Sequence, residues 1–557
     1  MEVGGNGNDH AAARARRPLS SLEVLRRHPQ HGYTLCSLLA SRAQTRARHP
    51  LIEFEGTTLT YGAALAAVAA LAAWLAGRGV RAGDRIALMC QNHPRVALMW
   101  FALARLGAIM VPINPEFGAA EAGYIFGNAE VSGVVCDPAA LATARAASAD
   151  MPQRPWLVLS GAGNPDEDAA GIPVLDDELA CPAASVVVAA DAPDATCLLI
   201  YTSGTTGFPK GVMHAQKSAV MGGEAFVERI AAQPEERLLC VMPMFHMNAL
   251  VYSLCGSIAA GATLILSPRF SAATFWQTVA ASRATEVNTI AAISNILIAR
   301  PRSEFVPGHS LRKMSGAPYS PAMIEVFNRE FGVPTVVESY GMSEIPGVLN
   351  NPVDPGPRPG SMGLLARHPD PDLPFSQVRI VDEDGREVPA GTTGEITVRI
   401  PIIMQGYWRD PERTAAAFRD GWFLTGDLGY RDADGYYWFV ARKKDIIRRR
   451  GENISGAELD RVIGEHPAVA EAAALAVPSP LGEDDILVAV VRRSGMGLAA
   501  EEVAAWCRAR LAAHKVPRHV VFVDGLPHTP THRVAKHRMD RAALLAAAVD
   551  LEAGRAG

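Results

Sequence analysis

Short apolar runs alternate with segments of helical periodicity through the first 440 residues, and this alternation is the strongest constraint on the fold. Leu65, Val68, Leu71 and Leu75 recur at the spacing of one helix face. Between such segments lie runs with the length of buried strands: Arg85–Met89, Val131–Cys136, Cys197–Tyr201, Leu238–Val241, Ala262–Leu266 and Thr335–Glu338. Strands and helices in alternation are typical of α/β folds with largely parallel sheets, which is the class that we expect.

The pattern changes after a Pro- and Gly-rich stretch, Asn351 to Pro374, which we expect to be a long loop. The strand-like runs Val378–Val381, Gly394–Val398 and Tyr436–Val440 follow it. A last unit, from about 442 to 545, alternates helices (Gly456–Glu465, Ala500–His514) with strands (Ala472–Val477, Asp485–Arg492, Val520–Val523). The sequence therefore predicts a large N-terminal domain of parallel-rich sheets with helices and a β-rich subdomain, and a small α+β C-terminal domain.

Composition and charge exclude several classes of protein. The 557 residues are 49% hydrophobic and 20% charged, as in ordinary globular chains, and a net charge of −5 leaves no general basic footprint for nucleic acid. The eight cysteines form no CxxC pair, which favours reduced thiols over disulfides or zinc. The apolar runs fall short of the ~18 residues that indicate a membrane span. We expect a cytoplasmic protein with no nucleic-acid partner and no membrane span.

The run from Tyr201 to Gly211 carries the sharpest chemical signal. It begins at the end of an apolar strand and contains three glycines and four Ser or Thr hydroxyls. Backbone N–H groups and hydroxyls at this density can point at one anion, and Lys210 adds a point charge suited to phosphate. Its spacing differs from a Walker A loop, which disfavours a P-loop NTPase. The run predicts a loop that binds phosphate.

This run closely resembles the phosphate loop of the adenylate-forming superfamily, which includes acyl- and aryl-CoA synthetases, adenylation domains of peptide synthetases and firefly-type luciferases. Four further motifs resemble that superfamily in the same order: Ser315–Pro318, Glu338–Glu344, Gly421–Asp427, and Arg442–Asp445 followed by Gly451–Asn453. The resemblance covers almost the whole chain. It implies nucleotide binding by Thr202, Ser203, Gly204, Thr205, Thr206, Gly207, Lys210, Gly316, Ala317, Pro318, Glu338, Ser339, Tyr340, Gly341, Met342, Ser343, Asp427 and Arg442.

The resemblance also implies individual roles. Glu344 would be a catalytic residue that holds Mg²⁺ together with Thr205, since this hard cation prefers carboxylate oxygens and phosphates. Asp427 would accept both ribose hydroxyls beside Arg442, and Ser343 keeps the hydroxyl of the family's threonine. The expected cofactors and substrates are ATP or acyl-AMP, Mg²⁺ and coenzyme A.

The segment Pro243–Asn248 resembles the family's acyl-pocket flank, and His246 would gate the passage between that pocket and the pantetheine channel. Amino-acid-activating relatives carry an aspartate near here, whereas this chain has no acid between Met242 and Ser253, which favours a substrate without an α-amine. The expected substrate-binding residues are His246, Met247, Ala292, Gly316, Gly341 and Gly347. These small and apolar candidates for the pocket wall suit an apolar carboxylic acid.

By the same resemblance, Lys444 is the hinge about which a mobile C-terminal domain rotates between two half-reactions, and Gly451 and Arg448 face CoA. The basic run around them is otherwise expected to be a solvated face. We expect a flexible tail over 1–25, an AMP-binding domain over 26–440, a hinge over 441–445, the C-terminal domain over 446–545 and a second tail over 546–557.

One segment departs from the family. Where the family carries P-x-T-x-x-G-K with a catalytic lysine, His532 replaces the glycine and Arg533 replaces the lysine. General replacement of lysine by arginine is one explanation, because only seven of the 53 basic residues are lysines. The other is that adenylation is impaired or lost while thioester formation survives, in which case a partner ligase would supply the acyl-adenylate.

The leading hypothesis is therefore an acyl-CoA ligase that forms a thioester through an acyl-adenylate, with adenylation weakened at Arg533. Three alternatives stay open: a complete two-step ATP-dependent acyl-CoA synthetase, a ligase that charges a carrier protein in trans, and a non-catalytic binder of acyl-adenylates. A luciferase-like oxygenase is more remote.

Overall fold

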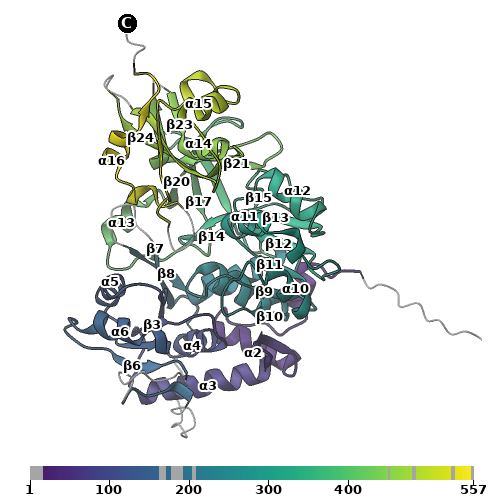
Figure 1. The fold of residues 1–557 in the computed structure, drawn as a ribbon. Helices are drawn as coiled ribbons and strands as arrows, with labels where there is room; N and C mark the ends of the chain where they lie inside the picture. Colours follow the sequence, from purple (N-terminus) through teal and green to yellow (C-terminus); the bar gives the residue numbers. More distant parts are fainter. Residues whose placement is uncertain are drawn as a thin grey trace, which may run out of the picture.

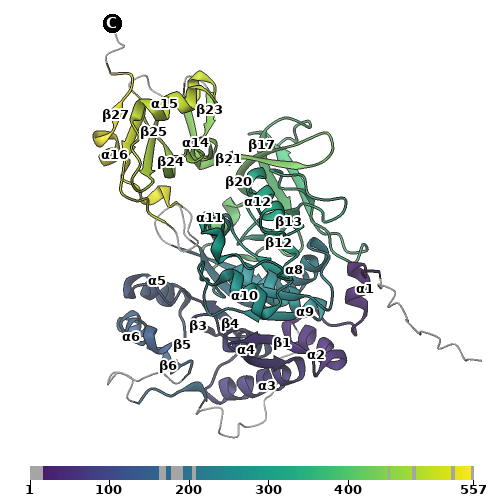
Figure 2. The same ribbon diagram turned by 45° about the vertical axis from the view of Figure 1, so that its right-hand side comes forward.

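The computed structural model describes residues 17–161, 171–176, 192–202, 209–449, 452–479, 484–528 and 534–553, without the side chains of Lys444, Glu452, Asn453 and His537. The α/β class is confirmed: two large sheets and their helices make up most of the molecule. A small C-terminal unit lies at the end opposite α3 (Tyr61–Gly77) (Figure 1, Figure 2). Among the described residues no helix has the length and apolar character needed to cross a membrane.

One large sheet has seven strands in the order β18-β8-β7-β4-β3-β5-β6. Strands β4, β3, β5 and β6 run parallel to one another and to β7, whereas β8 and β18 are added antiparallel. Ile86 and Leu88 face the main core and Ala87 and Met89 face a second one, so both sheet faces are buried, which explains the continuous apolar run in the sequence. The strands are β3 (Arg85–Met89), β4 (Ile109–Pro112), β5 (Gly133–Cys136), β6 (Trp156–Leu159), β7 (Thr196–Thr202), β8 (Lys210–Ala215) and β18 (Gly406–Tyr407).

The other large sheet has nine strands in the order β15-β14-β13-β12-β11-β9-β10-β1-β2. Its centre, from β13 to β1, is parallel, and its edges are antiparallel. The strands are β1 (Pro50–Phe54), β2 (Thr57–Thr60), β9 (Arg237–Cys240), β10 (Thr263–Leu266), β11 (Glu286–Asn288), β12 (Lys313–Gly316), β13 (Thr335–Met342), β14 (Ile345–Asn350) and β15 (Leu364–Leu365). Every strand expected in this half of the chain is present, and β15 lies inside the expected loop.

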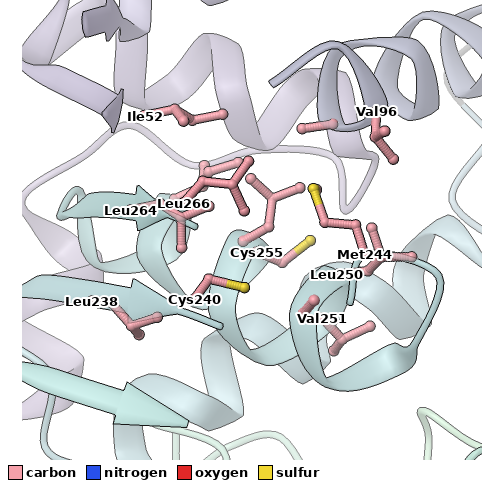
Figure 3. Close-up of a cluster of buried hydrophobic side chains, with 14 of the residues drawn as sticks. Ile52, Val96, Leu238, Cys240, Met244, Leu250, Val251, Cys255, Leu264 and Leu266 are labelled. Atoms are coloured by element: carbon pink, nitrogen blue, oxygen red, sulfur yellow. The ribbon is translucent and has the colours of Figure 1, made fainter. Parts of the chain in front are cut away.

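The main hydrophobic core fills the space between these sheets. Figure 3 shows Leu250, Val251 and Cys255 in one cluster with residues of β9 and β10. These three belong to a π-helix, η3 (Asn248–Cys255), a rare conformation that occurs mostly near functional sites. The other helices of this region are α1 (Ser21–Arg26), α2 (Leu35–Arg46), α4 (Pro94–Arg105), α5 (Ala119–Ala129), α6 (Leu141–Ser148), α8 (Gln216–Arg229), α9 (Gly256–Ala260), α10 (Phe275–Ser282), α11 (Ala291–Ala299), α12 (Pro321–Arg329) and α13 (Pro411–Ala416).

The β-rich subdomain and the small unit follow in the chain. The subdomain is an antiparallel sheet of β16 (Gln377–Val381), β17 (Gly394–Arg399), β20 (Trp422–Arg431), β19 (Phe418–Arg419) and β21 (Tyr437–Arg442). The small unit contains a hairpin, β22 (Ile446–Arg449) and β23 (Glu452–Ser455), and a four-stranded sheet, β24 (Val469–Pro478), β25 (Asp484–Arg492), β26 (His519–Phe522) and β27 (Val549–Asp550). Its helices are α14 (Gly456–Gly464), α15 (Ala500–Arg508) and α16 (Arg541–Ala547).

Three expectations about the chain need correction. Residues 17–25, expected in a tail, include most of α1, whose Val24 is fully buried. Residues 546–553, also expected in a tail, add β27 to the small sheet, where Asp550 pairs with Arg518 at 2.9 Å. The helix expected over Ala500–His514 ends at Arg508, after which the chain turns back to pair β26 with β25.

Candidate active site

The end of β13 and the turn after it form the centre of the candidate site. This segment, Glu338 to Glu344, contacts three other motif segments that are distant in the sequence: Glu338 pairs with Gly316 in the sheet, Tyr340 bonds to Asp427, and Glu344 bonds to Lys210. Three of these segments lie at the carboxyl ends of β7, β12 and β13, where open α/β sheets bind ligands, and the fourth, Gly421–Asp427, lies on β20 of the antiparallel subdomain.

Glu344 and Lys210 form a buried ion pair. Lys210 Nζ lies 2.5 Å from Glu344 Oε1 and donates to the Tyr407 hydroxyl at 2.7 Å, and that hydroxyl donates to the same Glu344 oxygen at 2.9 Å. Burial alone would raise the pKa of Glu344, but the charge of Lys210 and the hydrogen bonds from Lys210 and Tyr407 bring that pKa below its ordinary value. Glu344 is therefore held as a carboxylate. Tyr407 has no part in the sequence motifs.

Lys210 also closes the hairpin that carries the phosphate-loop motif. Thr202, the last residue of β7, pairs with Lys210, the first residue of β8. Ser203, Gly204, Thr205, Thr206 and Gly207 lie outside the described residues, so their expected contacts stay predictions. Thr202 Oγ1 is buried without a hydrogen-bond partner among the described residues.

Asp427 is the centre of a second cluster. Its side chain is buried; Oδ2 accepts a hydrogen bond from the Tyr340 hydroxyl at 2.7 Å, and Arg442 Nε lies 3.1 Å from Oδ1. The position follows from the sheet register, because Asp427 on β20 pairs directly with Arg442 on β21. Tyr340 on β13 and Glu344 in the turn after it belong to one β-hairpin, so the two clusters are neighbours. The structure thus brings together five motif residues: Lys210, Glu344, Tyr340, Asp427 and Arg442.

The segment Gly316–Pro318 follows β12 and lies against β13. A side chain at Gly316 has no room, since a Cβ there would lie 2.3 Å from the Tyr319 hydroxyl and 2.6 Å from the Thr289 carbonyl oxygen. Glu338 Oε1 accepts the Tyr319 backbone N–H at 3.2 Å, and Oε2 has no partner among the residues described. Burial raises the pKa of Glu338 to about 7.

The rest of the central turn is fixed through its backbone. The Ser343 carbonyl accepts from His214 Nε2 at 2.6 Å, and burial lowers the pKa of His214 to about 4, which keeps this imidazole neutral. A Cβ at Gly341 would lie 2.5 Å from the Gly347 nitrogen, so the chain approaches itself closely here. Ser339 and Met342 pair with β14.

The expected acyl-pocket residues lie on two elements near this turn. His246 and Met247 lie between β9 and η3, where the His246 N–H donates to the Pro243 carbonyl at 3.0 Å. Ala292 lies at the start of α11, which the Ala291 N–H ties to the Ala317 carbonyl at 3.4 Å.

Asn92 positions the His246 turn, although no motif includes it. Its Nδ2 donates to the Met242 and Ser267 carbonyls, each at 3.0 Å, and its Oδ1 accepts the Met244 N–H at 2.7 Å. Asn92 lies more than 150 residues away in the chain, so local patterns could not identify it. The same holds for His214 and Tyr407.

The basic residues between 442 and 450 lie in different environments. Lys443 pairs with Glu395 at 3.1 Å, and Arg448 has an exposed side chain. Arg449, in contrast, is buried and pairs with Asp485 and Glu552, each at 3.1 Å, so it stabilises the small unit. The side chain of Lys444 and all of Gly451 lie outside the described parts.

The segment that departs from the family is described only at its ends. His532 and Arg533 lie outside the described residues, so the role expected for Arg533 stays a prediction. Lys536, the nearest lysine, is described: its Nζ lies 2.6 Å from Asp460 Oδ2 on α14, within the small unit.

Comparisons with known proteins agree with this geometry. Residues 39–408 match the family model "AMP-binding enzyme", and residues 458–533 match "AMP-binding enzyme C-terminal domain". The chain is 33% identical over 523 residues to the sulfoacetate–CoA ligase of Cupriavidus necator, covering 92% of this chain and 99% of that protein. It is 32% identical over 500 residues to the indoleacetate–CoA ligase of Aromatoleum aromaticum, covering 87% and 93%.

A solved structure extends the likeness to three dimensions. The anthranilate CoA ligase AuaEII in complex with anthranoyl-AMP matches with a TM-score of 0.83 and 25% sequence identity, covering 94% of this chain and 99% of that one.

Proposed function

This chain belongs to the AMP-binding enzyme family, and on that premise we propose that it is an acid–thiol ligase that forms acyl-CoA from an acyl-adenylate. The observation that carries the proposal is the single hairpin of β13 and β14 that joins the Lys210–Glu344 pair to the Tyr340–Asp427–Arg442 cluster. A cation beside a buried carboxylate suits a phosphate chain, and a second buried carboxylate suits ribose hydroxyls. Together they have the donors and acceptors that ATP and acyl-AMP require.

In this proposal the chain's own residues bind and orient the nucleotide. Asp427 accepts hydrogen bonds from the two ribose hydroxyls, with Arg442 beside it. Lys210 moves from Glu344 to the phosphates, because an ammonium is a strong partner for a phosphate oxygen. Gly316 and Gly341 let neighbouring protein segments pack directly against the backbone of β12 and β13, which fixes the walls of this site.

Glu344 has the chemistry expected of a Mg²⁺ ligand, since it is held as a carboxylate by a cation that a metal ion could replace. Thr205 would join it in the metal site. When bound, Mg²⁺ would neutralise phosphate charge. The acid's carboxylate would attack the α-phosphate of ATP to give acyl-AMP and pyrophosphate, and the CoA thiolate would then displace AMP.

The small unit would rotate about residues 441–445, with Lys444 as the pivot, between these steps. A described hydrogen bond crosses this pivot, since the Ser455 hydroxyl donates to the Val440 carbonyl at 2.8 Å. Just before the pivot, Lys443 pairs with Glu395 of β17. Both are polar contacts at exposed or partly buried positions, so breaking them costs little free energy. Gly451 and Arg448 would face CoA after the rotation.

The finer proposal concerns the first half-reaction. We propose that adenylation is impaired because Arg533 takes the place of the family's catalytic lysine, and that thioester formation is retained. Arginine keeps the charge, but its planar fork does not replace a compact ammonium between two oxyanions. Lys536 cannot easily take over, because its ammonium is engaged by Asp460. The adenylate would then come from a partner ligase.

Two assays test these statements. The full chain is supplied with CoA and either synthetic acyl-AMP or the matching acid with ATP, using acids without an α-amine. Rapid acyl-CoA formation from acyl-AMP, with a rate ~10²-fold lower from acid and ATP, is the expected result. Equal rates would establish a complete two-step synthetase. Transfer of the acyl group to a pantetheinylated carrier protein but not to CoA would show that the carrier protein is the acceptor. Transfer to neither acceptor would show that the protein is a non-catalytic binder.

A further inference from the structure

A buried arginine lies at the wall of the candidate acyl pocket, outside every sequence motif. Arg229 is the last residue of α8, and only 3% of its surface is exposed. Its guanidinium carbon lies 4.3 Å from the ring centroid of Tyr252 and 5.6 Å from that of Phe226. Its Nε is buried and has no hydrogen-bond partner in the described part of the chain.

Arg229 also has no ion-pair partner among the residues that the structure describes. The charge of Arg229 does act on one acid, Glu286 of β11, which is fully buried. Burial and the charge of Glu236 raise the pKa of Glu286 well above its ordinary value, although the charge of Arg229 opposes this. Neither carboxyl oxygen of Glu286 forms a hydrogen bond among the described residues, so Glu286 does not pair with Arg229. A buried cation without a counter-charge is costly for a protein to keep.

Two expected pocket elements place this guanidinium. A Cβ built on Gly347 would lie 1.8 Å from Arg229 Nη2, so the guanidinium occupies the space directly in front of the Gly347 backbone. Tyr252, which stacks on the other side, belongs to the π-helix that starts two residues after His246. Arg229 is therefore held between the two segments that flank the acyl pocket.

Polar character continues along the same wall. Asn288, the last residue of β11, is buried, donates to the Ser253 hydroxyl of η3 at 3.0 Å, and keeps its Oδ1 without a partner among the described residues. A pocket for a wholly apolar acid would gain nothing from these groups. The expectation of an apolar acid rested on the small wall residues alone and did not include these polar groups.

Resting on the proposed function, we propose that the acid carried by this enzyme has a second anionic group, a carboxylate or a comparable oxyanion, that binds Arg229 at the far end of the acyl pocket. A planar guanidinium can form two parallel hydrogen bonds to such a group. Gly347 lets the guanidinium approach, and Tyr252 orients its plane.

The test measures binding rather than turnover, so it does not depend on Arg533. The full chain is titrated calorimetrically with two non-hydrolysable acyl-sulfamoyl adenosines, each with a four-carbon acyl group. One carries a butyryl group, and the other carries a succinyl group whose second carboxylate is free. The expected result is at least tenfold tighter binding of the succinyl analogue. In Arg229→Met this preference should disappear, because binding of the succinyl analogue weakens while binding of the butyryl analogue stays the same.

Arg105→Met is the matched control, because Arg105 also ends a helix, α4, with a buried Nε that lacks a partner among the described residues. It should keep the preference. Should Arg229→Met fail to fold, Arg229→Gln serves instead, since it removes the charge but keeps a polar side chain.

The outcomes separate the two proposals. Equal binding of both analogues by the unmodified chain, or a preference that survives in Arg229→Met, overturns the second-anion inference and leaves the ligase proposal intact. If neither analogue binds while the protein is folded, the proposed function itself fails and the inference falls with it.

Discussion

Lys210 Nζ lies 2.5 Å from Glu344 Oε1 in a pair that belongs to two different sheets. Lys210 begins β8 of the seven-stranded sheet, and Glu344 lies in the turn after β13 of the nine-stranded sheet. The pair therefore marks where the two sheets meet at the candidate site. Because both charges are largely shielded from water, whatever binds here must replace the contact it breaks.

This pair leads to a prediction about ATP. Lys210→Ala should weaken ATP binding at least tenfold but leave binding of a non-hydrolysable acyl-adenylate analogue little changed, because the analogue lacks the β- and γ-phosphates. The variant also leaves Glu344 buried without its cation, so the free energy of unfolding should fall by about 1–3 kcal/mol. Calorimetry and urea unfolding measure the two effects. Lys515→Ala, which removes a lysine paired with Glu458 in the small unit, is the control for binding; equal losses for both ligands would contradict the assignment.

Asp427 should behave differently from Lys210. The ribose is common to ATP and acyl-AMP, so Asp427→Asn should weaken both ligands by a similar factor, of the order of tenfold for lost charge-assisted hydrogen bonds. Calorimetric titration of both nucleotides against the same protein tests this. A loss confined to ATP would place Asp427 near the phosphates instead of the ribose.

Glu338 predicts a pH dependence of stability. Burial raises its pKa to about 7 in the folded chain, against an ordinary value of 4.5. Between these values the folded state keeps a proton that the unfolded state has lost, so this group's contribution is complete below pH 4.5 and is lost as the pH rises through 7. Glu338→Gln removes the effect. Relative to the unmodified protein, the variant should gain up to about 3 kcal/mol between pH 4.5 and pH 8 in urea unfolding. A constant difference across that range would show that Glu338 stays ionised.

Glu224 predicts the opposite dependence. Its carboxylate joins His31 at 3.0 Å and His368 at 3.1 Å, and so ties α8 to the N-terminal segment and to the loop after β15. Burial would raise its pKa, but these hydrogen bonds outweigh burial and lower that pKa to about 2. Its contribution is therefore present above pH 4.5 and is lost as the pH falls towards 2. Glu224→Gln should cost about 1–3 kcal/mol at pH 7 and progressively less below pH 4.5. The same cost at pH 3 and pH 7 would contradict the assignment.

The strands that were located from the sequence, such as β3, stand out because they are buried on both faces, whereas short strands such as β11 and β15 were not located. Ile86 to Met89 alternate between two cores, so every position is apolar and the run stands out. The chain ends could not be judged this way. Alanine and charged residues dominate the segments around α1 and β27, and their order depends on long-range contacts such as that of Arg518 with Asp550.

In the candidate site, too, some residues could be predicted from the sequence and others could not. Residues of the motifs, such as Asp427 and Glu344, were identified because each motif is contiguous in the sequence. Asn92, Tyr407 and Arg229 were missed, because each reaches the site from an element with no motif of its own. Their roles come from tertiary contacts, which local patterns do not encode.

The last prediction concerns the segment that departs from the family. Arg533→Lys should raise acyl-CoA formation from acid and ATP, by up to ~10²-fold when combined with His532→Gly, and leave formation from synthetic acyl-AMP unchanged. The reason is that a compact ammonium can reach between a carboxylate and the α-phosphate, whereas a guanidinium needs a wider approach.

Lys536→Met is the discriminating control for that prediction. Lys536 pairs with Asp460 inside the small unit, so removing it should lower stability modestly and leave the ratio of the two activities where it was. Should Lys536→Met abolish the reaction from acid and ATP while Arg533→Lys leaves it unchanged, Lys536 would be the adenylating lysine of this chain, reached by a rearrangement that breaks its contact with Asp460. Comparable rates from both substrates in the unmodified protein would show instead that Arg533 itself supports adenylation, and the requirement for a partner ligase would fall away.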